Sequence, residues 1–415
     1  MTMHSATLAI DEQVRHRREA GQSVLHLGFG EAGLPVPASL MEIFAAGACR
    51  NSYGPVVGWP QAREAAAGWF SRRGLSTDPQ QIVFGPGSKP LLFALVAAIG
   101  GDVVLPEPAW VSYAAQATLL NRRVIPVPIP RRAGGVPDPA LLDDALHRAQ
   151  ARGARPGVLV LTIPDNPTGT VAWPSDVEAV CMIAERHGLA IIVDEIYAEL
   201  CHDGSAPRVS HYLPDRTVVT SGLSKSLSLG GWRIGFARSP ASDWGQQLIR
   251  DLTGVASEIW SSLASPMQVV AGHVLNDPAD ILEHIAAARR LHARIASAVY
   301  DEFMQAGAIC RRPQAGFYLY PDFEPVKAAL GSQGIRTSTE LARTMLDRHG
   351  IAVLSGHAFG ESDMTLTVRV ATSLLYGTTT EERWAALTAP EPEKLPWITD
   401  ALAVLRRELH TLTGR

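Results

Sequence analysis

Short runs of β-forming residues alternate with helix-forming stretches between residues 81 and 225, and this alternation limits the folds open to the chain. The β-rich runs cover 82–84, 103–105, 124–127, 158–162, 191–193 and 218–220, and the helical stretches lie near 87–99, 110–121, 138–151 and 173–187. Such alternation is typical of a mostly parallel sheet with helices on both faces. We therefore predict an α/β fold with one large sheet-based domain.

The rest of the chain predicts a second, smaller α+β domain. Residues 240–306 have a helical pattern, including a long helix from about 278, and strands are expected at 316–320, 351–354 and 366–370. Residues 1–20 form a short helix or a tail that becomes ordered only against the body, and glycines and prolines break the strand-like run that follows them. We expect residues 1–50 to contribute to the small domain and a pocket loop, 51–285 to form the large domain, and 286–415 the small C-terminal domain.

Composition excludes several classes of protein. Of 415 residues, 46% are hydrophobic and 19% charged, which is typical of a globular enzyme, and the formal net charge of −4 argues against nucleic acid as a partner. Four cysteines lie far apart, so neither a disulfide framework nor a zinc site is expected, and we predict no metal. No signal sequence and no apolar run of membrane-spanning length is visible. We therefore expect a cytoplasmic protein without a membrane partner.

Polar and glycine-containing motifs stand at the ends of five predicted strands. They cover 85–89, 106–113, 164–169, 194–197 and 221–225. In open parallel sheets, ligands bind outside the carboxyl ends of the strands. The five motifs therefore predict one binding site along that edge of the sheet.

The stretch 221–235 contains a lone lysine, Lys225, among serines and before the glycine pair Gly230-Gly231. A lysine held in a turn of small residues after a strand, partly desolvated and near a second cation such as Arg233, is expected to titrate low enough to serve as an amine nucleophile. The alternative is a lysine in a mobile loop that points at water. This stretch alone does not decide between the two.

Two further motifs suit a flat, anionic ligand. Gly87, Ser88 and Lys89 lie where a strand turns into an apolar helix, and backbone N–H groups at a helix start bind phosphate well. The motif is neither a Walker A loop nor GxGxxG, and an ordinary strand-to-helix turn also favours Gly and Ser. Trp110 is placed to stack on a ring, or else is an ordinary aromatic on a helix face.

Four side chains complete the predicted site. Asn166 offers an amide donor in a turn, and Asp194 follows an apolar strand, where it either caps the next helix or pairs with a buried cationic ring nitrogen. Tyr197 lies near Asp194 and can offer its phenol to a ring oxygen. Arg369 interrupts an apolar strand and therefore needs an anion, such as a substrate carboxylate.

Together these motifs resemble the class I/II aminotransferases, which are fold-type I pyridoxal-phosphate enzymes of the aspartate aminotransferase type. The resemblance spans about residues 23–390 and rests on 166–169, 194–197, 224–225, 231–235 and Arg369 in that order. It implies a large domain with a sheet of the seven-stranded type and pyridoxal 5′-phosphate as the cofactor. It also implies that Lys225 forms the Schiff base and later carries a proton, and that Asp194 keeps the pyridinium nitrogen protonated.

The resemblance also assigns the remaining residues. Asn166 and Tyr197 would bind the ring oxygen, and Trp110 would stack on the ring. The residues implied to hold the phosphate are Gly87, Ser88, Lys89, Arg233 and Ser224. Tyr53 would reach the phosphate of the partner subunit, which implies a homodimer with shared active sites. Gly33 would line the substrate pocket, Asn166 would also contact the substrate, and Arg369 would bind its α-carboxylate.

The sequence departs from the family pattern at several positions. Gly222 stands where Ser or Thr is frequent, so one phosphate hydroxyl is missing unless Ser221 replaces it. Lys89 is unusual in the phosphate loop, where it either tightens phosphate binding or reaches toward a substrate acid. Ser355 stands where proline is common, and His357, where a small residue is common, is expected at the surface.

The predicted activity is transfer of an amino group from an L-amino acid to a 2-oxo acid. The alternatives are a pyridoxal-phosphate-dependent lyase, cyclase or oxidase, and an inactive ligand-sensing module, which the missing basic helix-turn-helix before residue 23 disfavours. The absence of a second obvious arginine weighs against aspartate as the best donor. Apolar Phe29, Leu34 and Val36 near the pocket loop favour a neutral or aromatic side chain.

Overall fold

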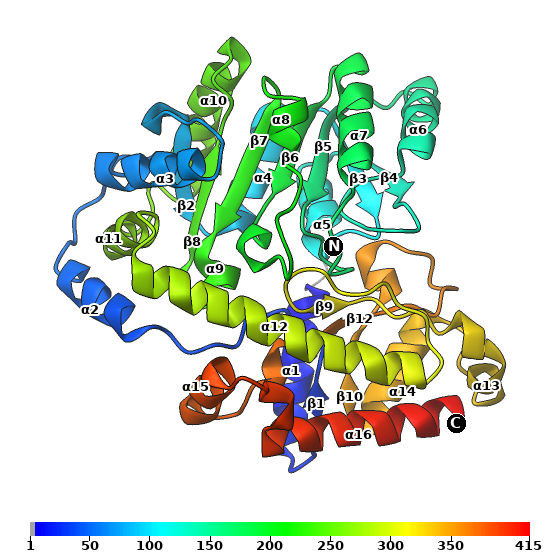
Figure 1. Cartoon of the computed structure of the whole chain (residues 1–415). Helices are drawn as coiled ribbons and strands as arrows, with labels where there is room; N and C mark the ends of the chain where they lie inside the picture. Colours follow the sequence, from blue (N-terminus) through cyan, green and yellow to red (C-terminus); the bar gives the residue numbers. More distant parts are fainter. Residues whose placement is uncertain (1–4) are drawn as a thin grey trace.

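The structure of the chain, a computed structural model, describes residues 5–415 and confirms the predicted mostly parallel sheet (Figure 1). Seven strands lie in the order β2-β8-β7-β6-β5-β3-β4. They are β2 (Ile82–Pro86), β3 (Asp102–Glu107), β4 (Val124–Pro128), β5 (Pro156–Thr162), β6 (Ala190–Asp194), β7 (Thr217–Gly222) and β8 (Ile234–Arg238). Six of these strands were predicted from the sequence. The seventh, β8, was not predicted, and it is antiparallel to both β2 and β7.

Helices cover both faces of this sheet, as the alternation predicts. One face packs against α3 (Pro60–Arg72), α6 (Pro139–Ala151), α7 (Pro174–Arg186), α8 (Val209–Tyr212) and α11 (Ser265–Val274). The other face packs against α4 (Ser88–Ile99), α5 (Val111–Leu119) and α10 (Asp243–Ile259). Each connection between parallel strands therefore passes through a helix, which leaves the strand ends free for functional loops.

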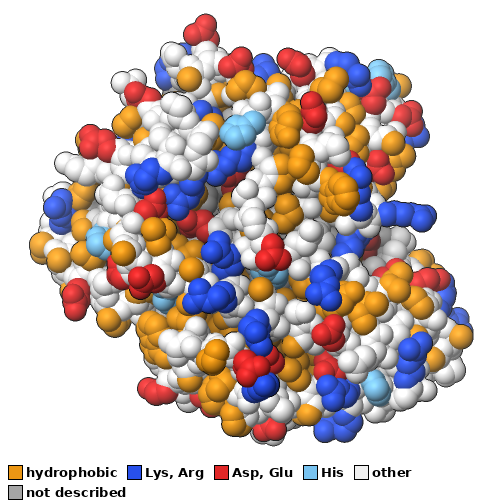
Figure 2. Space-filling model, in the orientation of Figure 1, with side chains coloured by type: hydrophobic (Ala, Val, Ile, Leu, Met, Phe, Trp, Pro, Cys, Tyr) orange, Lys and Arg blue, Asp and Glu red, His pale blue; other side chains and the backbone are white. Residues whose placement is uncertain are grey.

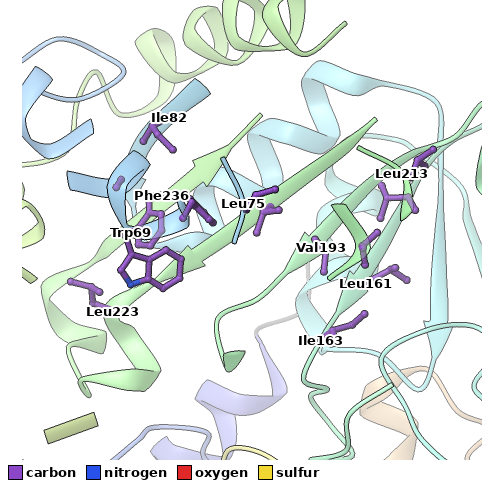
Figure 3. Close-up of a cluster of buried hydrophobic side chains, with 14 of the residues drawn as sticks. Trp69, Leu75, Ile82, Leu161, Ile163, Val193, Leu213, Leu223 and Phe236 are labelled. Carbon is purple, nitrogen blue, oxygen red and sulfur yellow. The ribbon is translucent and has the colours of Figure 1, made fainter. Parts of the chain in front are cut away.

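Side chains of the central strands alternate between two separate cores. On β5, Leu159 and Leu161 belong to the core under α6 and α7, whereas Val158 and Val160 face α4 and α5. Figure 3 shows part of the first core, in which Trp69 packs edge-on against Phe236 with 5.5 Å between ring centroids. Burial on both faces explains why these strands consist almost entirely of apolar residues.

The long helix α12 (Ala279–Gln305) leads from the large sheet to the second unit (Figure 1). Ile285 packs in the core of the large sheet, and Ala288, less than one turn later, packs in the core of the second unit. That unit contains a three-stranded sheet, β11 (Leu354–Ser355), β12 (Val368–Ala371) and β9 (Tyr318–Leu319). Its helices are α13 (Lys327–Ser332), α14 (Ser338–His349), α15 (Thr380–Thr388) and α16 (Pro396–Thr413).

The N-terminal segment packs against the second unit although it is distant in sequence. Strand β1 (Leu25–His26) pairs in parallel with β10 (Ile351–Ala352). The predicted N-terminal helix is α1 (Ala6–Glu19), and residues 1–4 of that prediction lie outside the described residues. Helix α2 (Ala38–Gly47) returns the chain to the large unit, where it packs against α11.

Surface charge and thiols agree with a globular protein. Figure 2 shows Lys and Arg side chains interspersed with Asp and Glu over one face of the molecule. All four cysteines carry free thiols. Within residues 5–415, no helix combines the length and apolar character needed to cross a membrane.

Candidate active site

A cavity of about 330 Å³ lies at the carboxyl ends of β5, β6 and β7. Its volume is within the range of small-molecule sites. Most residues that the sequence predicted for the site line it: Ser88, Lys89, Trp110, Asn166, Asp194, Tyr197, Ser224, Lys225, Arg233 and Arg369. The strand-end motifs therefore meet in space as expected for an open parallel sheet.

Lys225 lies in α9 (Leu223–Ser226), a single turn that follows β7 directly. Its Nζ donates a hydrogen bond of 2.6 Å to the carbonyl oxygen of Gly30, in the N-terminal segment. Gly30 lines the same cavity. The interaction holds the amine inside the cavity through a neutral acceptor.

Asp194 is the last residue of β6 and is buried. Burial raises the pKa of its carboxyl to about 6, while the backbone N–H of Ile196, the hydroxyls of Thr220 and Tyr113, and the charge of Lys225 act in the opposite direction. The Tyr113 hydroxyl lies 3.4 Å from Asp194 Oδ2 and 2.7 Å from the Thr162 hydroxyl. A cationic partner bound in the cavity would favour the charged form of this buried carboxyl, which burial alone disfavours.

Arg369 lies on β12 and is fully buried. Its Nη2 donates to the Gly28 carbonyl at 2.5 Å, and its Nη1 lies 3.5 Å from Asn166 Oδ1. Its Nε has no hydrogen-bond partner among the described residues. The partners of this buried guanidinium are thus neutral oxygens, and an anion entering the cavity gains a charge-assisted interaction.

Tyr197 and Tyr318 connect the two units across the cavity. Their hydroxyls lie 2.9 Å apart, and the ring of Tyr318 packs against the Arg369 guanidinium at 4.8 Å. Burial raises the pKa of Tyr197 far above its ordinary value, so its phenol stays protonated and can donate.

The residues present fit pyridoxal phosphate. Gly87, with φ +92°, caps the start of α4, and a Cβ added there would lie 2.3 Å from Arg233 Nη2. Burial lowers the pKa of Lys89, and the charges of Arg233 and Lys225 lower it further. Clustered cations at a helix N-terminus suit a phosphate, while Asp194 suits a pyridinium nitrogen and Lys225 an aldehyde carbon.

Four residues singled out in the sequence lie elsewhere. Tyr53 is 89% exposed and does not line the cavity of its own chain. Gly33 packs against the Ser373 backbone, where an added Cβ would lie 2.6 Å from the carbonyl oxygen. His357 is exposed, as expected. At Gly222 a Cβ would lie 2.7 Å from the Ile234 carbonyl, so close packing against β8 explains the departure from Ser or Thr.

Sequence reasoning missed several residues of the cavity. They include Tyr318 on β9, and Thr7 and Leu8 on α1, while Tyr113 on α5 lay inside the predicted 106–113 motif but was assigned no role. Tyr113 follows Trp110 by one helical turn, which is a usable signal once Trp110 is placed in the site. Nothing local marks Thr7 or Leu8, because they reach the cavity only through packing of α1 on the second unit.

Comparisons with known proteins agree with this geometry. Residues 23–380 match the family model described as aminotransferase class I and II. The chain is 31% identical over 391 residues to an aspartate aminotransferase of Geobacillus stearothermophilus, covering 89% of this chain and 92% of that protein. It is also 31% identical over 372 residues to an aspartate/prephenate aminotransferase of Cereibacter sphaeroides, covering 86% and 90%.

Among solved structures, the aspartate aminotransferase from Thermus thermophilus with maleate superposes with a TM-score of 0.83 at 26% identity. The superposition covers 98% of this chain and 97% of that one. Family match, full-length similarity and the converging site residues lead to one conclusion. The chain belongs to the class I and II aminotransferases and is a pyridoxal-phosphate-dependent enzyme that transfers amino groups.

Proposed function

We propose that the amino donor is an acidic L-amino acid, with aspartate as the first candidate, and the acceptor a 2-oxo acid. This donor differs from the neutral or aromatic one that the sequence favoured, and Lys89, which supplies a second cation in place of a second arginine, carries the proposal. It lines the cavity with Arg369, and its Nζ lies 5.0 Å from the centre of the Trp110 ring. Two curated relatives are named for aspartate, which supports the same donor.

The charge inside the cavity favours a ligand with several negative groups. Lys89, Lys225, Arg233 and Arg369 line it, against the acids Glu31 and Asp194. A cofactor phosphate and one substrate carboxylate leave a further cation for a second carboxylate. We assign the α-carboxylate to Arg369 and the side-chain carboxylate to Lys89. Of the apolar residues expected near the substrate, Phe29 lines the cavity, while Leu34 and Val36 pack into the cores.

The residues around the cavity also suggest how the cofactor would be held. Gly87, Ser88, Arg233 and Ser224 would hold the phosphate, with Trp110 against the ring. Asn166 and Tyr197 would donate to the ring oxygen, and Asp194 would pair with the ring nitrogen. When bound, pyridoxal phosphate supplies an electron sink for the pair left at the substrate α-carbon.

Lys225 would move the proton in this reaction. Its Nζ lies inside the cavity and would hold the cofactor through its aldehyde carbon until the substrate amine replaces it. As a free amine, Lys225 would act as the base that takes the substrate α-proton and then as the acid that gives it back. The Gly30 carbonyl, 2.6 Å from Nζ, holds the amine without neutralising it.

Replacement of Lys89 tests the donor assignment. We expect Lys89→Gln to lower kcat/KM for aspartate by about 10- to 100-fold, the effect of losing one charge-assisted contact, and to change kcat/KM for leucine little. The matched control is Lys327→Gln, which removes an exposed lysine paired with Glu324. Equal losses with both substrates would contradict the assignment and place Lys89 on the cofactor phosphate.

The comparisons do not favour a lyase, cyclase or oxidase, because the named relatives are transaminases. We further propose a homodimer in which Tyr53 of each subunit reaches the cofactor phosphate of the other. The 89% exposure of its ring on the single chain supports this role. Four free thiols support a reducing, cytoplasmic location.

We also propose the domain boundaries expected from the sequence, with residues 51–285 as the large domain and residues 286–415, together with 1–50, as the small one. The change of core between Ile285 and Ala288 supports a boundary near residue 285. The pairing of β1 with β10 supports a contribution of residues 1–50 to the small domain. Helix α2 departs from this division, because it packs against α11 of the large unit.

A further inference from the structure

An aspartate and two histidines lie together on the outer surface of α6 and α7. Asp143 and His147 are one turn apart on α6, and His187 follows the last residue of α7. His187 Nε2 lies 2.9 Å from Asp143 Oδ1, and His147 Nδ1 lies 3.7 Å from Asp143 Oδ2. Each of the three residues offers one ligand atom, and these three atoms lie within 4.8 Å of one another.

We propose that Asp143, His147 and His187 form a binding site for a divalent metal ion of the Zn²⁺ type. Imidazole nitrogen and carboxylate oxygen are the ligands that Zn²⁺ takes, at about 2.0–2.2 Å in tetrahedral sites. Ligand atoms on such an ion are about 3.3 Å apart. The two separations above lie on either side of that value. Three protein ligands leave the fourth position to water.

Metal binding would require the exposed ring of His147 to turn, while the ring of His187 could stay in place. The ring of His187 is fixed, since its side chain is only 8% exposed, and it meets the ring of His147 edge-on at 4.9 Å. His147 is 64% exposed, and its Nδ1 also lies 2.9 Å from the Asp143 carbonyl, so this ring turns to complete the site.

Arg186 competes for the same carboxylate. Its Nη2 lies 3.0 Å from Asp143 Oδ1, and its side chain is 60% exposed. Exposed ion pairs of this kind contribute little to stability, because water replaces either partner easily. A metal ion held by three ligands therefore displaces the guanidinium into solvent.

The site lies apart from the reaction. The end of α7 leads into the amino end of β6, whereas the active site uses the carboxyl end of that strand. None of the three residues lines the active-site cavity. An ion bound there would join α6 to α7 and thereby stabilise the large unit, and it would leave amino transfer unchanged.

Metal titration of the tag-free holoenzyme tests the proposal. The probes are Zn²⁺ by calorimetry and Co²⁺ by its visible absorption, with Zn²⁺ added afterwards to displace it. We expect one equivalent to bind to the wild type. His147→Ala, His187→Ala and Asp143→Asn should each weaken binding about tenfold or more, because each removes one ligand.

The matched control is Asp144→Asn, which changes the adjacent carboxylate, paired with Arg148. It should bind metal as the wild type does. All four variants should keep aminotransferase activity, which shows that they are folded, and Zn²⁺ should raise the Tm of the wild type by about 2 °C or more. Absence of binding to the wild type, or equal binding by all variants, would overturn the proposal.

Discussion

Asp194 and Glu195 are adjacent buried carboxyl groups with different surroundings. Asp194 lines the cavity, whereas Glu195 is influenced by Arg208 and Arg238 and does not line it. Burial raises the pKa of Glu195 to about 7, and its Oε1 has no hydrogen-bond partner within residues 5–415. The sequence predicted Asp194 because it follows an apolar strand. The sequence did not indicate that Glu195 lies outside the cavity, because this depends on the direction in which each of the two side chains points.

Glu195 should make stability depend on pH. The folded protein keeps this group protonated up to about pH 7, whereas the unfolded chain releases the proton near the ordinary pKa of 4.5. Between these values the folded state binds more protons, so the group lowers the free energy of unfolding as pH rises. Relative to wild type, Glu195→Gln should therefore gain about 2–3 kcal/mol between pH 4.5 and 7.

Denaturant or thermal unfolding of both proteins across this range, with saturating cofactor, measures the difference. Only its change with pH is diagnostic, because the substitution also removes a negative charge near Arg208 and Arg238. A difference that stays constant from pH 4.5 to 7 would show that Glu195 is ionised throughout.

At the scale of elements, strands and helices followed from local patterns, but the contacts between distant segments did not. The alternation of β-rich and helical runs predicted six strands of the large sheet, and the motifs at their ends predicted the cavity. Strand β8 escaped prediction because Gly235 and Arg238 interrupt its apolar run. The meeting of Gly30 with Lys225, and of Tyr318 with Tyr197, depends on how the second unit packs on the first.

An ion-pair cluster around Arg73 joins the end of α3 to the residues just before α12. Arg73, at the end of α3, binds Glu199 at 2.6 Å and Asp277 at 2.9 Å. Glu199 lies two residues after Tyr197, and Asp277 immediately precedes the residue that caps α12. The three side chains are at most 20% exposed, so each charge depends on its partners.

Loss of Arg73 should therefore be costly. We expect Arg73→Ala to lower the free energy of unfolding by about 2–4 kcal/mol, because it leaves the largely buried Glu199 carboxylate without a cationic partner, whereas Asp277 keeps its ion pair with Arg72. Arg73→Lys should recover part of the loss, since an ammonium cannot bind both partners through a planar fork. Chemical denaturation measures the effect, with Arg148→Ala, which breaks an exposed pair, as the control. Similar small losses in Arg73→Ala and Arg148→Ala would contradict this role.

At the scale of the whole molecule, the single chain leaves a large aromatic side chain, Tyr53, in solvent. The sequence placed Tyr53 in the site through family resemblance alone. In the structure it lies outside its own cavity, which is the expected position for a residue that serves a neighbouring subunit. The proposed contact would not be visible from patterns within one chain, because its partner would belong to another copy.

Mixing inactive variants tests whether active sites are shared. Lys225→Ala and Tyr53→Ala homodimers should each lose most activity. After unfolding and refolding together, mixed dimers should contain one intact site, and random pairing restores about a quarter of wild-type activity. If Tyr53 served its own subunit, no mixed dimer would contain an intact site and activity would stay at the level of the separate variants.

The central claim, that Lys225 is the amine that carries the cofactor in an aminotransferase site, is tested most directly by reduction with borohydride. We predict that reduction of the wild-type holoenzyme attaches the cofactor to the peptide containing Lys225, as read by mass spectrometry, and that Lys225→Ala gives no adduct. We also predict that aspartate added before reduction removes the adduct by converting the cofactor to its amino form, and that a 2-oxo acid restores it. An adduct on Lys89, or an adduct that no amino acid removes, would contradict the account.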